Sequence, residues 1–267
     1  MMPTPFQHLV YARDILADAR LPETIRQAMG EHLGAFLLGN TAVDVQSLTG
    51  QQRFATHFYH VHGENPTRAS ETLLATYPEL ADPARLHPAH AAFVSGYLAH
   101  LAWDECWLYD VFRPFYLESD LWPDRLARNI HHNALRVLMD RQAEATLRRW
   151  PNPLLLLLRE VRPDHWLPFV QSEALYRWRD WVTDQLANPE AVETALVFAG
   201  RMGISPEHFE AVISAVDQDT YRPPVLGLRD ALSTFEADAL TESIKVLKRY
   251  WGVRSKEYGT KNEESKN

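Results

Sequence analysis

Residues 88–112 decide the fold of this chain, and they read PAHAAFVSGYLAHLAWDECWLYDVF. The apolar residues recur at helical spacing, which predicts one long helix from about Pro88 to Phe112. Trp103, Trp107 and the leucines around them leave no wide polar face on such a helix. We therefore expect the helix to be mostly buried and to end near Pro114.

Helical patterns continue on both sides of this stretch. Thr4 is a plausible N-cap ahead of Pro5, and a second helix that begins near Pro22 is expected to end at Gly39-Asn40. Further helices are expected over residues 67–77, 123–150, 153–161, 171–187, 189–202, 206–217 and 227–251. Residues 41–65 carry little helical period and predict an irregular loop. Strand-like alternation is nearly absent, so the sequence predicts an all-α protein.

The amino-acid composition and net charge argue against several classes of function. The chain has 267 residues, 46% hydrophobic and 23% charged, which is ordinary usage for a folded protein. Its net charge of −8 argues against binding nucleic acid through a basic surface. The single cysteine, Cys106, excludes an intrachain disulfide and a cysteine-based zinc site. Of twelve histidines, ten lie in the first 132 residues, and histidine is the commonest metal ligand.

The chain carries no recognisable targeting or membrane segment. The N-terminus reads Met-Met-Pro-Thr-Pro-Phe and lacks the basic start and apolar run of a signal peptide. No apolar stretch approaches the roughly 20 residues of a membrane span. We therefore expect a cytoplasmic protein without a transmembrane segment. Its metal-binding helical core is expected over residues 1–150, with further helices over 151–254, in the same or a second domain, and a flexible tail over 255–267.

The sharpest candidate for chemistry lies inside the stretch quoted first. His100 and Asp104 are four residues apart, so on a helix they project from one face, one turn from each other. An imidazole and a carboxylate in this relation can bind one metal ion. The alternative is a His–Asp surface pair, but the apolar surroundings argue against full exposure, and a buried aspartate needs a partner.

Other candidates are weaker when each is taken alone. Asp44 follows an apolar helix as a lone acid and either binds a metal or caps a turn. His57, His60 and His62 fall within six residues; neighbouring positions cannot all face one site, so one or two of them would be ligands. His8 is either a ligand or a core histidine. In the adjacent pair His131-His132, one residue can face the core while the other faces solvent.

Taken in order, these elements resemble the zinc-dependent phospholipase C family, which is of phospholipase C/P1 nuclease type. The elements are the segment Pro5–Leu9 with His8, Leu38-Gly39 followed by Asp44, His57-Phe58, and Gly96-Tyr97-x-x-His100-x-x-x-Asp104. The resemblance covers roughly the first 110 residues. It implies a multi-helix bundle with a metal cluster at its centre and additional C-terminal helices.

The resemblance also implies a ligand set. Asp44, His57, His100 and Asp104 would bind the principal zinc, and Asp104 would bridge it to a neighbouring zinc at His8. Two features of the family are missing. The chain does not begin with Trp, and neither His131 nor His132 has Glu four residues later. His132 is still expected to bind a metal at an altered outer site, with Asp140 partly substituting for the missing Glu. One or two zinc ions are therefore expected rather than three.

The chemistry implied is hydrolysis of a small-molecule or lipid phosphoester, in which zinc polarises a phosphoryl oxygen and activates water. Asp44 would orient or deprotonate that water, Arg53 would bind an anionic substrate group, and Tyr97 would donate a hydrogen bond or only pack. Two alternatives stay open: a metal-dependent hydrolase of a non-lipid substrate on the same scaffold, and a non-catalytic metal-binding helical protein. The oligomeric state is left open. A His-Asp dipeptide, as in HD-type phosphohydrolases, is absent.

Overall fold

The computed structural model describes residues 5–150, 153–187, 194–219 and 227–253. Every regular element in these ranges is helical, and none of the described residues forms a strand. The all-α expectation is confirmed. The proposed N-cap Thr4 and the tail 255–267 lie outside the described residues. Within the described ranges, no helix has the length and apolar character needed to cross a membrane.

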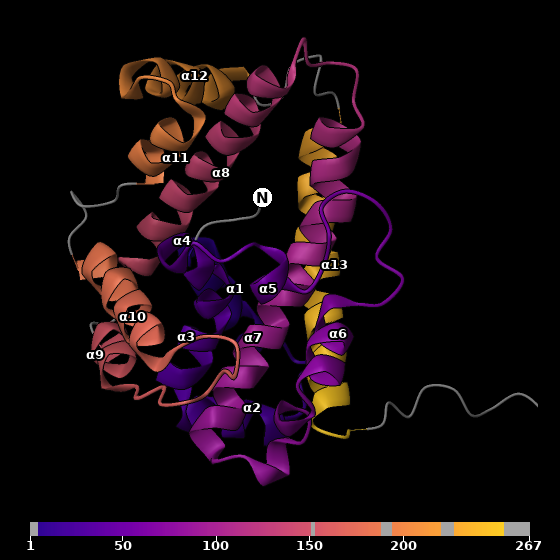
Figure 1. Ribbon diagram of the computed structural model, residues 1–267, viewed down its shortest axis with the longest axis vertical. Helices are drawn as coiled ribbons and strands as arrows, with labels where there is room; N and C mark the ends of the chain where they lie inside the picture. The colour runs from indigo at the N-terminus through magenta and orange to yellow at the C-terminus, as the bar shows by residue number, and fades with distance from the viewer. Residues whose placement is uncertain (1–4, 151–152, 188–193, 220–226, 254–267) are drawn as a thin grey trace, which may run out of the picture.

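Helix α7 (Pro88–Cys106) runs through the middle of the molecule (Figure 1). It begins where the sequence predicts, with the His87 side chain accepting a hydrogen bond from the Ala89 amide and Pro88 in the first turn. From Ala91 to Cys106 every residue is buried. The helix can be apolar on all sides because it packs against α3 (Leu33–Ala42) on one side and α13 (Leu228–Tyr250) on another.

The expected helix end at Gly39-Asn40 is wrong, because α3 continues through both residues to Ala42. Gly39 instead lies where α3 packs closely against α7. A Cβ placed there would lie 2.0 Å from the Phe93 carbonyl oxygen of α7, and one placed at Gly96 would lie 2.1 Å from the Phe36 carbonyl oxygen of α3. The two glycines thus let the backbones of α3 and α7 approach closely.

The expectation of one continuous helix from near Pro22 to Gly39-Asn40 is also wrong, because the chain forms two helices there. The chain forms α2 (Glu23–Glu31), turns at His32, where φ is −120° and ψ is 42°, and starts α3 at Leu33. Helix α1 (Pro5–Ala17) lies ahead of both and matches the predicted first helix. It packs against α3, α8 and α13.

Residues 41–65 are more helical than expected. They contain the 3-10 turn η1 (Val43–Val45), α4 (Gln46–Thr49) and α5 (Phe54–His57), each too short for a sequence period to reveal. Helix α5 ends at Phe58, which takes a left-handed conformation with φ of 57°. The loop that follows leads to α6 (Ala69–Thr76) and to the 3-10 turns η2 (Pro78–Leu80) and η3 (Pro83–Arg85).

Beyond Cys106 the helix changes type instead of ending before Pro114. Residues Trp107–Leu117 form a π-helix, η4, with Pro114 inside it. The wider i→i+5 spacing lets the chain continue past a residue that would break a regular α-helix. This segment packs against α8 (Arg125–Leu147) and α13.

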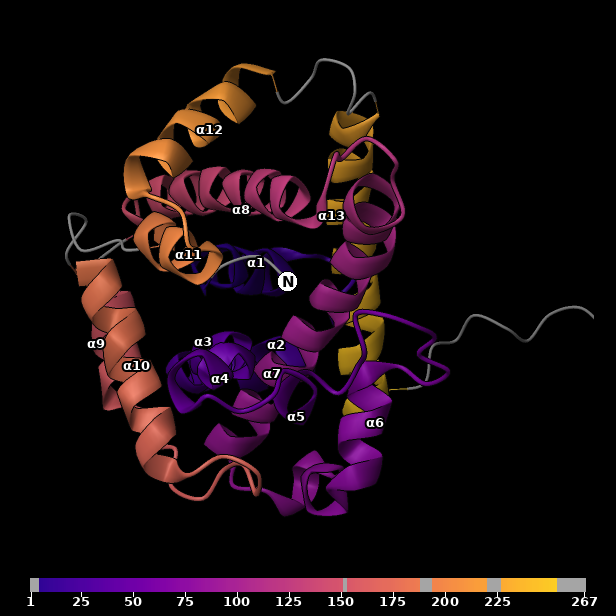
Figure 2. The ribbon, with the colours of Figure 1, turned by 45° about the horizontal axis from the view of Figure 1, so that its top comes forward.

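The remaining helices surround this centre in two groups, seen from two directions in Figures 1 and 2. Helices α9 (Pro153–Glu160) and α10 (Ser172–Ala187) pack together and against α3. Helices α11 (Thr194–Met202) and α12 (Pro206–Asp219) pack together and against α8. Side chains of α8, α11 and α12 form a small apolar cluster separate from the main core.

Candidate metal centre

Four elements bring five of the six predicted ligands together, and the sixth, His132, lies elsewhere. Helix α1 supplies His8, η1 supplies Asp44, α5 supplies His57, and α7 supplies both His100 and Asp104. Within the described part of the chain, potential ligand atoms form two groups of three, each spanning at most 4.8 Å. His8, Asp44 and His100 form the first group, and His57, His100 and Asp104 form the second. The two groups share His100.

The distances between these atoms suit a tetrahedral metal ion. His57 Nε2 lies 3.4 Å from Asp44 Oδ1 and 3.4 Å from Asp104 Oδ2. His100 Nε2 lies 3.3 Å from Asp104 Oδ2, one helical turn away, as their spacing predicts. Ligands placed about 2.1 Å from a zinc ion in tetrahedral geometry lie roughly 3.4 Å from one another.

Hydrogen bonds on the far sides of two imidazoles leave their inner nitrogens available. His100 Nδ1 lies 2.7 Å from the Asn40 carbonyl oxygen, so Nδ1 donates, and in the neutral ring Nε2 carries the lone pair. His57 Nδ1 lies 2.9 Å from Thr56 Oγ1. The inner atoms His57 Nε2 and His100 Nε2 are buried and have no hydrogen-bond partner.

His8 lies beside the shared histidine. Its ring stacks on that of His100 with the centroids 3.6 Å apart, and its Nε2 lies 3.7 Å from Asp104 Oδ1. Both His8 nitrogens and Asp104 Oδ1 are buried without a hydrogen-bond partner. Buried polar atoms are nearly always paired, so a cluster of unpaired donors and acceptors indicates a place for a bound cation.

The charge state of the cluster favours a cation as well. Burial lowers the pKa of His8, with help from His100, to about 3, and burial together with Arg53 lowers the pKa of His57 to about 4. Both imidazoles are therefore neutral at pH 7. Burial alone would raise the pKa of Asp104, but His100 and Arg53 outweigh it and hold this pKa at about 2.

The pKa values of the other two members of the cluster, Asp44 and His100, are shifted by the same competition between burial and nearby charges. The pKa of Asp44 lies well below its ordinary value, because His57, His100 and Arg53 outweigh the opposing effect of burial. The pKa of His100 is raised, because Asp104 outweighs burial. Two ionised carboxylates thus share the site with His100 and with the neutral imidazoles of His8 and His57, which is a donor set suited to zinc.

Arg53 reaches the same carboxylates from the rim of the site. Its Nη2 donates to Asp104 Oδ2 at 2.9 Å and to the Tyr59 hydroxyl at 2.7 Å, and its Nη1 lies 3.9 Å from Asp44 Oδ1. The arginine side chain is 21% exposed, whereas that of Asp104 is fully buried. Arg53 thus joins the centre to the molecular surface.

Tyr97 contributes to the centre through a hydrogen bond to the backbone beside His57. It is fully buried, and its hydroxyl donates to the Thr56 carbonyl oxygen at 2.6 Å. This bond ties α7 to α5 at the residue before His57. The hydroxyl is thereby committed to the backbone, so the contact gives Tyr97 a structural part; contact with a substrate stays a prediction.

His132 does not join either ligand group. It is buried among Trp107, Phe112 and Tyr116, and its Nε2 accepts a hydrogen bond from Trp107 Nε1 at 3.1 Å. The lone pair that a metal would use is therefore engaged. Asp140, which the sequence offers as its companion, accepts a hydrogen bond from Thr194 Oγ1 at 2.9 Å.

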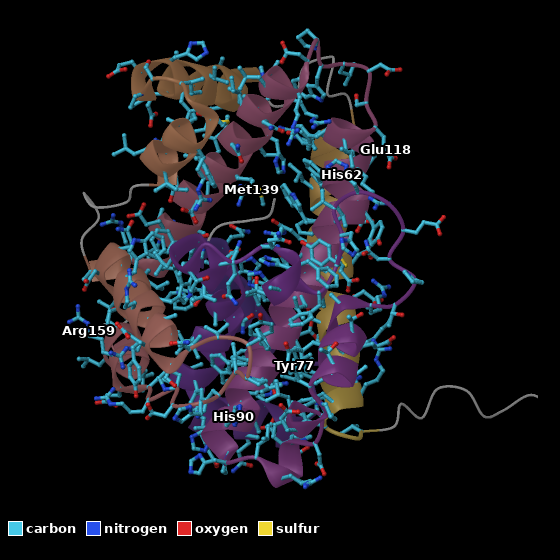
Figure 3. The ribbon with its side chains drawn as sticks, in the orientation of Figure 1. His62, Tyr77, His90, Glu118, Met139 and Arg159 are labelled. Atoms are coloured by element: carbon cyan, nitrogen blue, oxygen red, sulfur yellow. The ribbon has the colours of Figure 1, made fainter. Side chains whose placement is uncertain are left out.

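The remaining histidines are dispersed. His60 is exposed and stacks on Phe54, with the ring centroids 4.4 Å apart, so the structure places His57 and not His60 at the centre. His131 Nδ1 lies 2.9 Å from the Ala127 carbonyl oxygen. His62, near Glu118, and His90 lie toward different ends of the molecule (Figure 3).

A cavity of about 440 Å³ opens beside the centre, with Asp44 and Arg53 in its wall. The rest of its lining includes Arg136 of α8, Arg201 of α11, and Trp178 and Trp181 of α10. Sequence reasoning missed the two arginines. Arg136 lies four residues after His132 on the buried side of its helix, and this charged residue on an apolar face was the available signal.

No protein-family model matches the chain, and neither a curated protein nor a solved structure is significantly similar to it.

Proposed function

We propose that this protein is a zinc-dependent phosphodiester hydrolase whose site resembles that of the phospholipase C/P1 nuclease type. The observation that carries the proposal is the convergence of Asp44, His57, His100 and Asp104, with His8 alongside, in a buried cluster whose inner nitrogens have no hydrogen-bond partner. Such a cluster is costly in a folded protein unless it binds a cation.

The residues fit one or two zinc ions. The donors are imidazole nitrogens and carboxylate oxygens, their mutual distances are 3.3–3.4 Å around Asp104 Oδ2, and both Asp104 oxygens face histidines. A bound zinc ion would polarise a phosphoryl oxygen and lower the pKa of a nearby water molecule. The proposal keeps His132 outside the ligand set, because its Nε2 already accepts a hydrogen bond.

The chain's own groups supply the rest of the proposed reaction. The Asp44 side chain is 14% exposed and lines the cavity, so it can orient a water molecule and accept its proton. The Arg53 guanidinium reaches the same cavity and can contact a phosphoryl oxygen. His100 and Asp104 are fully buried and hold the centre in place. The Asp44 carboxylate, the Arg53 guanidinium and a bound cation would then lie along one wall of the cavity. A phosphoester suits this combination, because its anionic oxygens can contact the guanidinium and the cation.

Elemental analysis of the freshly purified protein tests the proposal directly. We expect bound zinc, turnover of bis(p-nitrophenyl) phosphate, and loss of both in His100→Ala and in Asp104→Ala. His57→Ala should lose metal. Two control variants at exposed positions, His60→Ala and Asp110→Ala in η4, should keep both metal and activity.

Two results would contradict the proposal in different ways. Protein that contains no transition metal, and takes up none, would exclude a metal centre. Protein that binds zinc but cleaves neither bis(p-nitrophenyl) phosphate, phosphatidylcholine nor members of a small ester panel would instead be a non-catalytic metal-binding protein. Cleavage of carboxylic esters alone would indicate a metal-dependent hydrolase of another substrate class.

A further inference from the structure

The end of α5 brings two side chains that are two residues apart in sequence to the same place. His57 is the last residue of the helix, and Phe58 after it takes a left-handed conformation, with φ of 57° and ψ of 20°. This conformation is uncommon for a residue that carries a Cβ, and it persists where the surroundings hold it. Phe58 is buried and packs edge-on against Phe169 and Tyr77. The turn places the Tyr59 ring edge-to-face with the His57 ring, with the centroids 6.0 Å apart.

The Tyr59 hydroxyl belongs to a closed set of hydrogen bonds beside the candidate ligands. Arg53 Nη2 donates to the hydroxyl oxygen at 2.7 Å and to Asp104 Oδ2 at 2.9 Å. The hydroxyl in turn lies 3.4 Å from the same carboxylate oxygen, to which it donates. The guanidinium carbon of Arg53 lies 5.5 Å from the centroid of the Tyr59 ring. Tyr59 is 2% exposed, so little water reaches the hydroxyl to take its place in these bonds.

The partners of Arg53 Nη2 determine which guanidinium nitrogen can meet a ligand. The guanidinium is planar and rigid, so two acceptors on Nη2 also fix the direction of Nη1. Nη1 lies 3.9 Å from Asp44 Oδ1, which is longer than a hydrogen bond, and Nε is buried. Arg53 and Asp44 both line the cavity, and the Arg53 side chain is 21% exposed. Nη1 is therefore the nitrogen that can donate to an oxygen of a ligand in the cavity.

From this geometry we propose that Tyr59 is a positioning residue for an anion that binds beside the candidate metal centre. Its hydroxyl holds Arg53 Nη2 against Asp104 and thereby directs Nη1 toward a phosphoryl oxygen in the cavity. The inference rests on the proposed phosphoester site and adds to it a residue that acts through Arg53 rather than by contact with the substrate.

The alternative is that Tyr59 only fills space in the core. Tyr59→Phe separates the two, because phenylalanine fills the same space without the hydroxyl. In this variant Arg53 Nη2 keeps only Asp104 as a partner, so the long arginine side chain samples more orientations and loses more conformational entropy when an anion binds. The zinc content should stay that of the parent protein, because the hydroxyl is not among the potential ligand atoms.

Calorimetric titration of the full-length protein with inorganic phosphate, as purified and after loading with zinc, tests this role without turnover. We expect Tyr59→Phe to raise the Kd for phosphate about tenfold, and Arg53→Gln to raise it at least as much. The variant with both substitutions should bind phosphate no more weakly than Arg53→Gln alone, because Tyr59 acts through Arg53. In hydrolysis of bis(p-nitrophenyl) phosphate, the effect of Tyr59→Phe should appear in KM, with kcat little changed.

Tyr11→Phe is the matched control. Tyr11 is 3% exposed, and its hydroxyl donates to Ser243 Oγ at 2.7 Å. This variant also loses one buried hydrogen bond, but none to Arg53, so it should keep the phosphate affinity of the parent protein. Arg53→Lys separates orientation from charge: an ammonium group keeps the charge but lacks the rigid fork, so phosphate should bind about as weakly as to Arg53→Gln.

Several results would overturn the inference: a parent protein that binds no phosphate, equal phosphate affinity in the parent protein and in Tyr59→Phe, or full affinity in Arg53→Lys. Weakening that adds up in the double variant would show that Tyr59 acts independently of Arg53, and loss of zinc from Tyr59→Phe would show that it supports the metal ligands instead. Non-additive weakening in a protein that hydrolyses no phosphodiester would support the role of Tyr59 and contradict only the hydrolase proposal.

Discussion

At the scale of single residues, the partner of each buried histidine determines what that histidine can do. His8, His57 and His132 are all buried, and burial lowers the pKa of each. Their inner nitrogens differ in what they contact. Those of His8 and His57 face carboxylates, whereas His132 Nε2 accepts a hydrogen bond from an indole. Equal burial thus yields two potential ligands and one packed side chain.

His132 should make the free energy of unfolding depend on pH. Its pKa in the folded protein lies well below the ordinary value of 6.5, so below pH 6.5 the unfolded chain binds a proton that the folded chain does not. Folded-state stability from this residue is therefore complete above pH 6.5 and falls as the pH drops, by about 1.4 kcal/mol per pH unit.

The variant His132→Gln isolates this contribution. Glutamine can still accept a hydrogen bond from Trp107 but does not titrate, so its unfolding free energy should fall less steeply between pH 6.5 and 5 than that of the parent protein. Urea denaturation of both proteins in EDTA at several pH values measures the two slopes. Equal slopes would show that His132 can be protonated in the folded state.

At the scale of elements, the contact between α3 and α7 positions the centre. Asn40, in the last turn of α3, presents the carbonyl oxygen that orients His100 on α7. Gly39 and Gly96 permit this approach because a Cβ at either position would lie within about 2 Å of a backbone oxygen. The distance between the two helix backbones therefore sets the orientation of a candidate metal ligand.

Gly39→Ala and Gly96→Ala should each destabilise the protein by at least about 3 kcal/mol, because the obstructing atoms are backbone atoms and the helices must move apart. Zinc binding should weaken as well, because Asn40 moves with α3. Gly30→Ala is the control: it lies in α2 with nothing within 4 Å, so alanine should be neutral or stabilise by about 0.5–1 kcal/mol. Thermal unfolding that ranks all three variants alike would contradict this account of the contact.

Two misjudged elements show where sequence reasoning reaches its limit. A glycine late in a helical pattern indicates a helix end, but close packing of two helices also requires a residue without Cβ, and the two needs look the same in sequence. Pro114 likewise indicates a helix end, yet η4 continues past it as a π-helix. Both outcomes depend on neighbours that lie far away along the chain.

At the scale of the whole molecule, the apolar core has two parts of unequal size. The larger part surrounds α3, α7 and α13, and the smaller one joins α8 to α11 and α12 through Phe198, Phe209, Ile213 and the residues around them. The larger core contains the candidate metal centre. The smaller one supports Arg201 and thus one wall of the cavity.

Amide hydrogen exchange should reveal this division. We expect amides of α11 and α12 to exchange through local opening at least tenfold faster than the slowest amides of α3 and α7, because less buried apolar surface holds them. Phe209→Ala should accelerate exchange in α11 and α12 without affecting α3 and α7. His208→Ala, at the exposed neighbouring position, is the control. Acceleration spread evenly over all helices would show that the two parts unfold as one unit.

The sequence by itself determined the helical class and the pairing of two candidate ligands on α7. An α-helix has 3.6 residues per turn, so residues four apart lie on the same face whatever the rest of the chain does. His100 and Asp104 therefore had to share a face once that helix formed. It also indicated His8, Asp44 and His57 as candidates, and the structure brings all three to the same pair.

Only the tertiary structure decided what these residues make together. Whether His57 or His60 enters the centre depends on the short helix α5 and on Tyr97 reaching across from α7. Two arginines of the cavity, Arg136 and Arg201, come from α8 and α11, and both helices lie far from Asp44 along the sequence. The distances between the candidate ligands, the neutral state of His8 and His57, and the lining of the cavity all arise from the packing of distant segments. The reason is that desolvation and Coulomb energy depend on distances in space rather than on positions along the chain.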